Sequence, residues 1–126
     1  MPVFALTIAF PWRLVLHDNH RLVPARGRKG LVASPEYRAA KLDATAWLKR
    51  LWLSRPQLAG EMVLHARCFF PDRRKRDAGN YRKLITDALT GVVYSDDSQL
   101  VSETWERAGF DKDYPRIEVT LTHPDR

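Results

Sequence analysis

Polar side chains of complementary chemistry recur at helical spacing in the middle of the chain. Asn80, Lys83 and Asp87 fall within one narrow sector of a helical wheel, and Asp77 stands at the expected N-cap position one turn before them. Two carboxylates, an amide and an ammonium therefore line a single face. Such a face can hold a hard divalent cation and stabilise the negative charge that builds on a phosphodiester.

A second acidic pair follows this helix. Asp96 and Asp97 lie one loop after it, and a helix of about 20 Å that returns into an adjacent strand can bring such a loop back toward the sheet. Mg²⁺ often takes only one or two carboxylates, with water and phosphate completing its shell, so Asp77, Asp96 and Asp97 are candidate ligands. A nearby lysine such as Lys83 can neutralise charge on the phosphate or assist the leaving group.

Two runs of basic residues accompany these candidate acidic ligands in the sequence. Lys and Arg exceed Asp and Glu by 21 to 15, and the formal net charge of +6 suits a polyanionic partner, although charge alone does not choose between DNA, RNA and a membrane surface. One basic run directly precedes Asp77, and another lies near the start of the chain. The residues expected to grip nucleic acid are Arg26, Arg28, Lys29, Arg73, Arg74, Lys75, Arg76 and Asn80.

Each of these features is also typical of an ordinary structural role. The position of Asp77 is typical of a helix cap, and the segment SDDS is typical of a polar turn. A basic run before a helix is typical of a solvated surface. His17 and His20 have no further histidine or cysteine to complete a zinc site, which favours loop or DNA-contacting roles. Phe69 and Phe70, at the end of an expected strand, are predicted to be core residues rather than an apolar wedge that enters a base stack.

The elements that must position these residues follow from hydrophobic periodicity. Residues 12–33 contain Pro24, Gly27 and Gly30 and show no periodicity, so we expect a long functional or mobile connection there. The pattern predicts an α/β fold in which a mixed sheet of about four strands packs two helices on one face. The expected strands are 3–10, 60–70, 98–108 and 116–123, and the expected helices are 34–54 and 78–90.

Length and composition limit the class of protein. The 126 residues are expected to form one domain, and the 44% hydrophobic and 29% charged fractions argue against disorder. No run of about 18 apolar residues occurs, which argues against a transmembrane helix. The single cysteine, Cys68, lies in an apolar run and is expected to be a buried hydrophobe. The N-terminal segment lacks the features of a signal peptide, so we expect a cytoplasmic protein.

The run PDRRKRDAGNYRKLITDALTG, followed by YSDDSQL, resembles the RusA family of Holliday-junction resolvases. The segment RGRKGLVASPEYR is similar to the basic segment and first helix start of that family. The resemblance implies a small phage-derived endonuclease, bacterial or phage-encoded, that uses Mg²⁺ or Mn²⁺. It also implies a homodimer that cuts two opposing strands of a four-way DNA junction. Asp77, Lys83 and Asp97 match the catalytic residues of the family, and Asn80 matches its motif asparagine.

Gly79 departs from the family pattern, because it stands where the family usually places a second aspartate. A glycine offers no ligand, and three hypotheses follow: a resolvase that uses a substitute carboxylate, a junction-binding protein with weak or no nuclease activity, or an altered sequence of an active parent. An RNA-binding or RNA-cleaving module is a further alternative. The substitute carboxylates considered are Asp72, Asp87 and Asp96.

Overall fold

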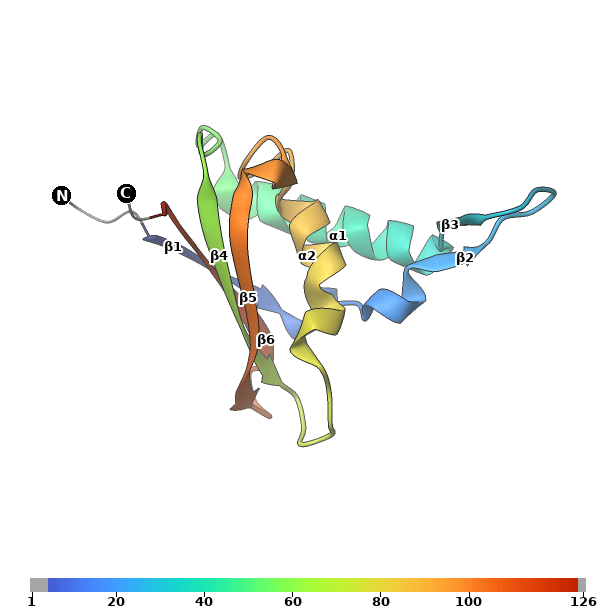
Figure 1. Cartoon of the computed structure of the whole chain (residues 1–126). Helices are drawn as coiled ribbons and strands as arrows, with labels where there is room; N and C mark the ends of the chain where they lie inside the picture. Colours follow the sequence, from blue (N-terminus) through green and yellow to red (C-terminus); the bar gives the residue numbers. More distant parts are fainter. Residues whose placement is uncertain (1–4, 125–126) are drawn as a thin grey trace.

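A computed structural model describes residues 5–124 and contains one four-stranded mixed sheet with two α-helices on one of its faces (Figure 1). The strand order is β1-β6-β4-β5, with β4 and β5 parallel and the other pairs antiparallel. The predicted α/β fold is therefore confirmed. The elements are β1 (Ala5–Pro11), α1 (Pro35–Trp52), β4 (Met62–Phe70), α2 (Arg82–Leu89), β5 (Leu100–Phe110) and β6 (Arg116–Thr122).

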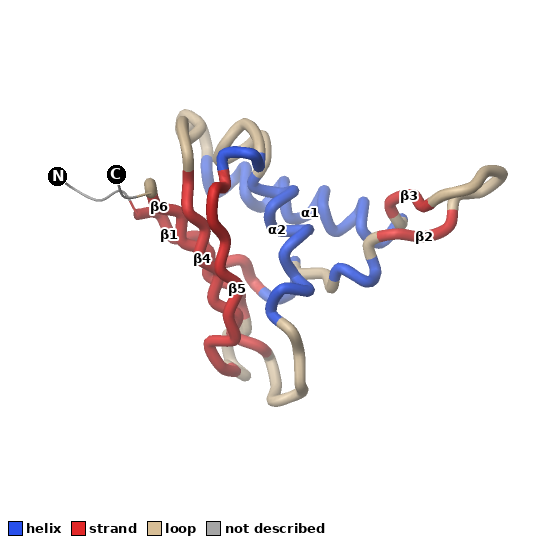
Figure 2. The backbone as a smooth tube through the Cα atoms, viewed as in Figure 1, coloured by secondary structure: helices blue, strands red, loops and turns tan. Residues whose placement is uncertain are grey.

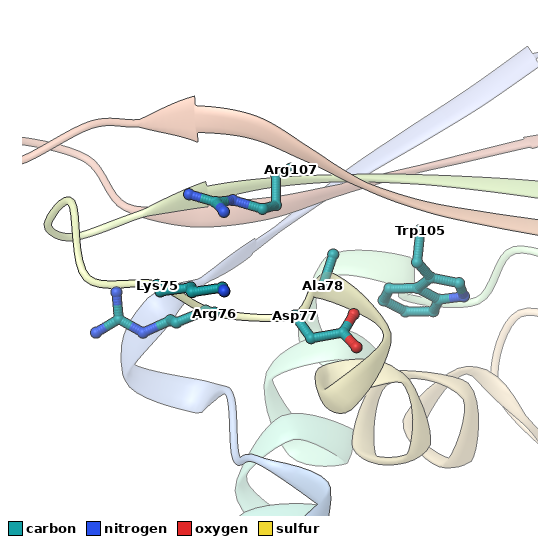
Figure 3. A pocket seen from close by; sticks show the side chains of 6 residues that line it. All are labelled: Lys75, Arg76, Asp77, Ala78, Trp105 and Arg107. Carbon is teal, nitrogen blue, oxygen red and sulfur yellow. The ribbon is translucent and has the colours of Figure 1, made fainter.

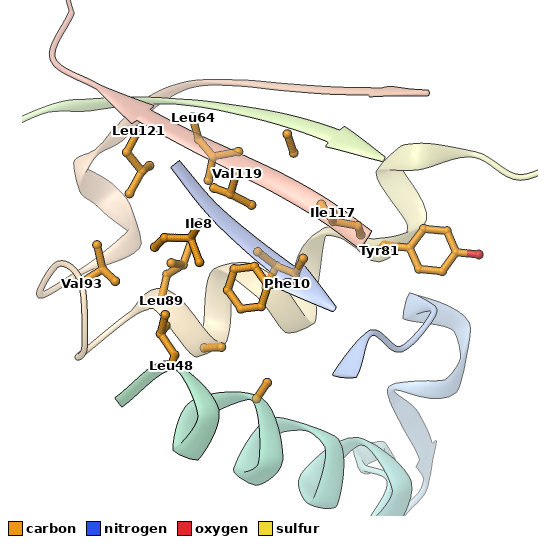
Figure 4. Packing of buried hydrophobic residues seen from close by; sticks show 14 of the residues in the cluster. Ile8, Phe10, Leu48, Leu64, Tyr81, Leu89, Val93, Ile117, Val119 and Leu121 are labelled. Carbon is orange, nitrogen blue, oxygen red and sulfur yellow. The ribbon is translucent and has the colours of Figure 1, made fainter. Parts of the chain in front are cut away.

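The helix-facing side of the sheet forms the core. Successive side chains of a strand point to opposite faces, and on β4 the alternating positions Leu64, Ala66 and Cys68 are fully buried. The facing positions of β6 are apolar as well, since Leu64 pairs with Leu121. Figure 4 shows side chains of this sheet face packed against those of α1 and α2. The strand predicted over 60–70 and the predicted burial of Cys68 are confirmed.

Most element boundaries agree with the prediction to within two residues at each end. The first strand begins at Ala5 in the structure, and the predicted positions 3 and 4 lie outside the described residues. On α1, Leu51 is half exposed, because Leu48 and Trp52, four residues apart, take the buried positions.

The segment that carries Asp77 connects the two parallel strands. Parallel neighbours require a crossover, and here it runs from β4 through a 3-10 turn, η3 (Ala78–Tyr81), into α2 and then β5. The region predicted as one helix from 78 to 90 is therefore a 3-10 turn followed by a shorter α-helix. In such crossovers the loop after the first strand and the start of the helix meet at the carboxyl end of the strands, where ligands commonly bind.

The connection between β1 and α1 is more ordered than expected. Two short 3-10 turns, η1 (Trp12–Leu14) and η2 (Asp18–His20), lead into a hairpin of β2 (Leu22–Pro24) and β3 (Leu31–Ala33). Strands of three residues carry too little periodicity to be recognised from the sequence. Figure 2 shows this β2–β3 hairpin extending away from the main sheet, beyond the start of α1.

Nowhere between residues 5 and 124 is a helix long and apolar enough to cross a membrane.

Candidate active site

Asp77 lies at the mouth of an open pocket between the loop after β4 and strand β5. Its side chain accepts a hydrogen bond from the Gly79 backbone N–H (3.1 Å), so Asp77 caps η3 as predicted while its carboxylate stays exposed. Figure 3 shows the pocket, which has a volume of about 420 Å³. A carboxylate flanked by cations in a concave surface suits an anionic ligand. The residues that line the pocket are Lys75, Arg76, Asp77, Ala78, Trp105 and Arg107.

The backbone at Gly79 does not require a glycine. Its φ is not in the left-handed region, and a Cβ placed there would meet only the Asp77 Oδ1 atom, at 3.6 Å. That distance is an ordinary van der Waals contact, so the fold accommodates a side chain at this position. A carboxylate introduced at position 79 would therefore stand beside that of Asp77.

Lys83 is fixed at both its backbone and its side chain. Its backbone N–H donates to Asp18 Oδ1 (3.2 Å), and its Nζ forms an ion pair with Asp87 Oδ1 (3.1 Å). The other carboxylate oxygen of Asp87 accepts a hydrogen bond from the Tyr37 hydroxyl on α1. The predicted proximity of Lys83 and Asp87 on one helix face is thus confirmed, and Asp87 is held by groups of the protein.

A bidentate ion pair joins α2 to β5 beside the pocket. Arg82 donates from Nε and Nη2 to the two carboxylate oxygens of Glu103 at 2.6 and 2.7 Å, and the Trp105 indole N–H donates to the same carboxylate at 3.1 Å. The Arg82 guanidinium lowers the pKa of Glu103. The Glu103 carboxylate raises the pKa of Arg82, and the charges of Asp97 and Asp18 add to this effect. The Arg82–Glu103 pair and the Trp105 indole therefore join α2 to the wall of the Asp77 pocket.

Asp96 and Asp97 lie at the start of a 3-10 turn, η4 (Asp97–Gln99), immediately before β5. Both side chains are exposed, and hydrogen bonds from Ser98 lower the pKa of Asp96. Among residues 5–124, no three His, Cys, Asp or Glu side chains converge into a ready-made metal site. The roles of Asp77, Asp96 and Asp97 as ligands remain predictions, and the donor set that the fold offers consists of separate carboxylates at two places.

The basic run before Asp77 divides into exposed and engaged residues. Arg73, Arg74 and Lys75 are exposed, whereas Arg76 is only 13% exposed and pairs with Asp72 at 2.6 Å. The hydrogen bond from Arg76 lowers the pKa of Asp72 to about 2. The guanidinium also lies over the rings of Trp12 and Phe70, at 5.6 and 5.4 Å from their centroids. Arg76 therefore braces the loop through Asp72, and a role of Asp72 as a substitute ligand remains a prediction.

The other basic cluster lies at the tip of the β2–β3 hairpin. Arg26, Arg28 and Lys29 are all exposed, and Gly27 and Gly30 adopt positive φ values of 71° and 108° that a glycine tolerates at a tight turn. Figure 1 shows this tip well separated from the loop that follows β4. Its role in binding nucleic acid remains a prediction.

The two weaker functional alternatives fit structural roles. The Nδ1 atom of His17 accepts a hydrogen bond from the Asn19 backbone, and its ring packs edge-on against Tyr81 at a centroid distance of 5.2 Å. Phe70 is buried in the core. The ring of Phe69 is covered by the Arg116 guanidinium at 4.0 Å.

Four residues of this region were not predicted as functional. Asp18 lay in a segment without periodicity, Tyr37 belonged to an expected helix, and Glu103 and Arg107 belonged to an expected strand. Burial raises the pKa of Asp18, whose side chain joins η2 to α2. The only signal in the sequence was the alternation that places positions 103, 105 and 107 on one face of β5.

The fold and the site together define a small α/β protein with an exposed carboxylate, flanked by cations, at a strand-to-helix crossover. Comparison with known proteins specifies the family. The family model described as "Endodeoxyribonuclease RusA" matches residues 11–122. A relative, "Crossover junction endodeoxyribonuclease RusA" of Shigella sonnei (strain Ss046), is 30% identical over 123 residues, which cover 97% of this chain and 96% of the relative. The chain belongs to the RusA family of endodeoxyribonucleases.

Proposed function

We propose that this protein is a structure-specific endodeoxyribonuclease that resolves four-way DNA junctions with the help of Mg²⁺ or Mn²⁺. The observation that carries the proposal is the pocket in which the Asp77 carboxylate lies among Lys75, Trp105 and Arg107. A phosphodiester needs cations to hold it and a carboxylate to bind the metal that assists its cleavage. The family membership supports the same reaction.

The side chains that line the pocket and the candidate residues outside it, Lys83, Asp96 and Asp97, divide the work between holding the DNA and reacting with it. Lys75 and Arg107 hold the backbone phosphate by charge, and Trp105 forms an apolar wall against a sugar or base. Lys83, fixed by Asp87, neutralises charge on the phosphate or assists the leaving group. The metal would be held by Asp77 and Asp97, with Asp96 as a further donor, and would supply an activated water and charge stabilisation.

The donor set fits a hard cation that retains much of its water. Exposed carboxylates at two places, with no preformed cluster among residues 5–124, suit Mg²⁺, which commonly binds through one or two carboxylates together with substrate phosphates. Binding of the metal would accordingly depend on the DNA. Isothermal titration of the protein with Mn²⁺, in the presence and absence of junction DNA, tests this dependence.

We also propose that the protein works as a cytoplasmic homodimer. Two-fold symmetry would let one dimer present two sites to opposing strands of a junction. The exposed basic tip of the β2–β3 hairpin would extend the DNA contact beyond the pocket. Sedimentation of the free protein and of its junction complex measures the number of subunits.

The decisive experiment incubates the parent protein and the Gly79→Asp variant with a synthetic four-way junction and Mg²⁺ or Mn²⁺. The backbone at Gly79 is not in the left-handed region and there is space for a Cβ, so the variant is expected to fold. Cleavage by the parent supports the proposal. Cleavage by the variant alone shows that the carboxylate missing at position 79 limits activity. Tight binding without cleavage by either protein contradicts the nuclease proposal.

Matched controls separate chemistry from folding. Gly79→Ala adds a Cβ without a charge, so only an effect specific to Asp reports on metal binding. A linear duplex of the same base sequence tests structure specificity. Structured RNA that competes better than junction DNA would instead support an RNA-directed role.

A junction-binding protein with weak or no nuclease activity is the second candidate function. Gly79 and the dispersed carboxylates favour it, while the cations of the pocket and hairpin are retained. The same experiment distinguishes the two functions, because binding and cleavage are measured separately.

A further inference from the structure

The Tyr37 side chain reaches the middle of α2 from the neighbouring helix. Tyr37 is 5% exposed, and its hydroxyl donates a hydrogen bond to Asp87 Oδ2. Burial and the Asp87 carboxylate raise the pKa of Tyr37, so the hydroxyl keeps its proton and acts as a donor. Asp87 binds Lys83 Nζ through its other oxygen, at 3.1 Å.

The position of Tyr37 is itself fixed by the start of α1. Its backbone N–H donates to Ser34 Oγ (2.9 Å), which caps the helix, and Ser34 Oγ donates to the His20 carbonyl of η2 (2.6 Å). The same η2 turn carries Asp18, which accepts from the Lys83 backbone N–H. Three elements, α1, η2 and α2, therefore meet at Lys83.

The ion pair between Lys83 and Asp87 is held more firmly than an ordinary ion pair on a protein surface. A lysine and an aspartate four residues apart on a helix gain little when both are free to rotate, because the pair is screened and loses side-chain entropy. Here the Asp87 side chain is 21% exposed and is held by a buried phenol, so its carboxylate presents a fixed oxygen to the ammonium. The ammonium is consequently held before any substrate binds.

We propose that Tyr37 is a positioning residue, which acts through Asp87 to hold the Lys83 ammonium in place for the reaction. The relay rests on the proposed nuclease function, because only that function gives Lys83 a role at the phosphate. The relay itself is a property of the free protein, so it can be tested without cleavage.

The first test observes the Lys83 ammonium by ¹⁵N NMR of the full-length protein. An ammonium held in an ion pair exchanges protons slowly enough to give a signal, which Lys83→Ala assigns by its loss. We expect Tyr37→Phe and Asp87→Asn to weaken or abolish this signal. Tyr94→Phe is the matched control, since it removes another buried hydroxyl that donates to α2, at Thr86 O (3.4 Å). Absence of the signal in the parent, an unchanged signal in Tyr37→Phe, or an equal loss in Tyr94→Phe would overturn the relay.

The second test measures single-turnover cleavage of a four-way junction by the parent or, if needed, by Gly79→Asp. Tyr37→Phe is expected to lower the rate about tenfold, because misplacing a reacting group is costly, with an unchanged junction Kd. In a Lys83→Ala background, Tyr37→Phe should lower the rate by less than about twofold, since the ammonium that Tyr37 positions is absent. An equal loss in both backgrounds would overturn the relay. If neither protein cleaves, the proposed function fails while the NMR test still decides the relay.

Discussion

The cations of α2 and those of the β2–β3 hairpin meet the rest of the protein in different ways. Arg82 and Lys83 are each paired with a carboxylate that other groups hold, through Trp105 in one case and Tyr37 in the other. The hairpin cations are exposed, and we find no ion pair for them among residues 5–124. Charges that are fixed can act at one atom, whereas charges that are free can follow a DNA backbone of variable shape.

This contrast predicts which measurement each region controls. Changes near α2 should affect the rate of cleavage or the stability of the fold. Changes in the hairpin should affect the affinity for DNA and its dependence on salt. The following variants test this division, from the largest expected effect to the smallest.

Asp77→Asn should lower the single-turnover cleavage rate about 100- to 1000-fold, the usual cost of removing a group that stabilises a transition state. Asparagine is as good a helix cap as aspartate, so the fold and the junction Kd should change little. Rate and filter-binding measurements on the same preparation provide the check. If the affinity for the junction fell in proportion to the rate, Asp77 would contribute to DNA binding rather than to the reaction.

Replacing Arg26, Arg28 and Lys29 together by Ala should weaken junction binding, while cleavage at saturating DNA is retained. Each lost phosphate contact should reduce the slope of log K against log salt by about 0.9. Binding titrations over a range of salt concentrations measure this slope. The control removes three exposed cations of α1, Lys41, Lys49 and Arg50. An equal loss in the control would show that net charge, rather than the hairpin, governs binding.

Glu103→Gln should destabilise the fold by about 1 kcal/mol at neutral pH, because Arg82 loses its charged partner in a partly exposed pair. Arg82 lowers the pKa of Glu103 in the folded protein, so its contribution is present above the ordinary value of 4.5 and is lost as pH falls through the folded pKa. The free energies of unfolding of the parent and the variant, measured by urea denaturation, should therefore become equal as the pH is lowered. A difference that persisted in acid would mean that the ion pair is not its cause.

Gly79→Ala should raise the free energy of unfolding by about 0.5 kcal/mol, because alanine reduces the entropy of the unfolded chain and the site has space for a Cβ. Urea denaturation measures this gain. Cleavage should be unchanged, in contrast to Gly79→Asp. Destabilisation by alanine would show that position 79 does require glycine.

Gly79 illustrates the limit of prediction from the sequence. A glycine in a first helical turn costs up to about 1 kcal/mol relative to alanine, which suggests a structural reason for its presence. The structure shows no such reason, since the φ is ordinary and the space is open. The cost of a glycine is visible in the sequence, whereas the room around it depends on neighbours that fold beside it.

The sequence by itself determined the four strands of the main sheet, the two α-helices to within a few residues, and the pairing of Lys83 with Asp87 on one helix face. Alternation in β4 and the spacing of Lys83 and Asp87 are local patterns, and local geometry turns them directly into buried and facing positions. The tertiary structure alone decided which residues from distant segments meet there. Asp18, Tyr37 and Glu103 reach α2 from 65, 50 and 21 residues away, and no local periodicity encodes such contacts.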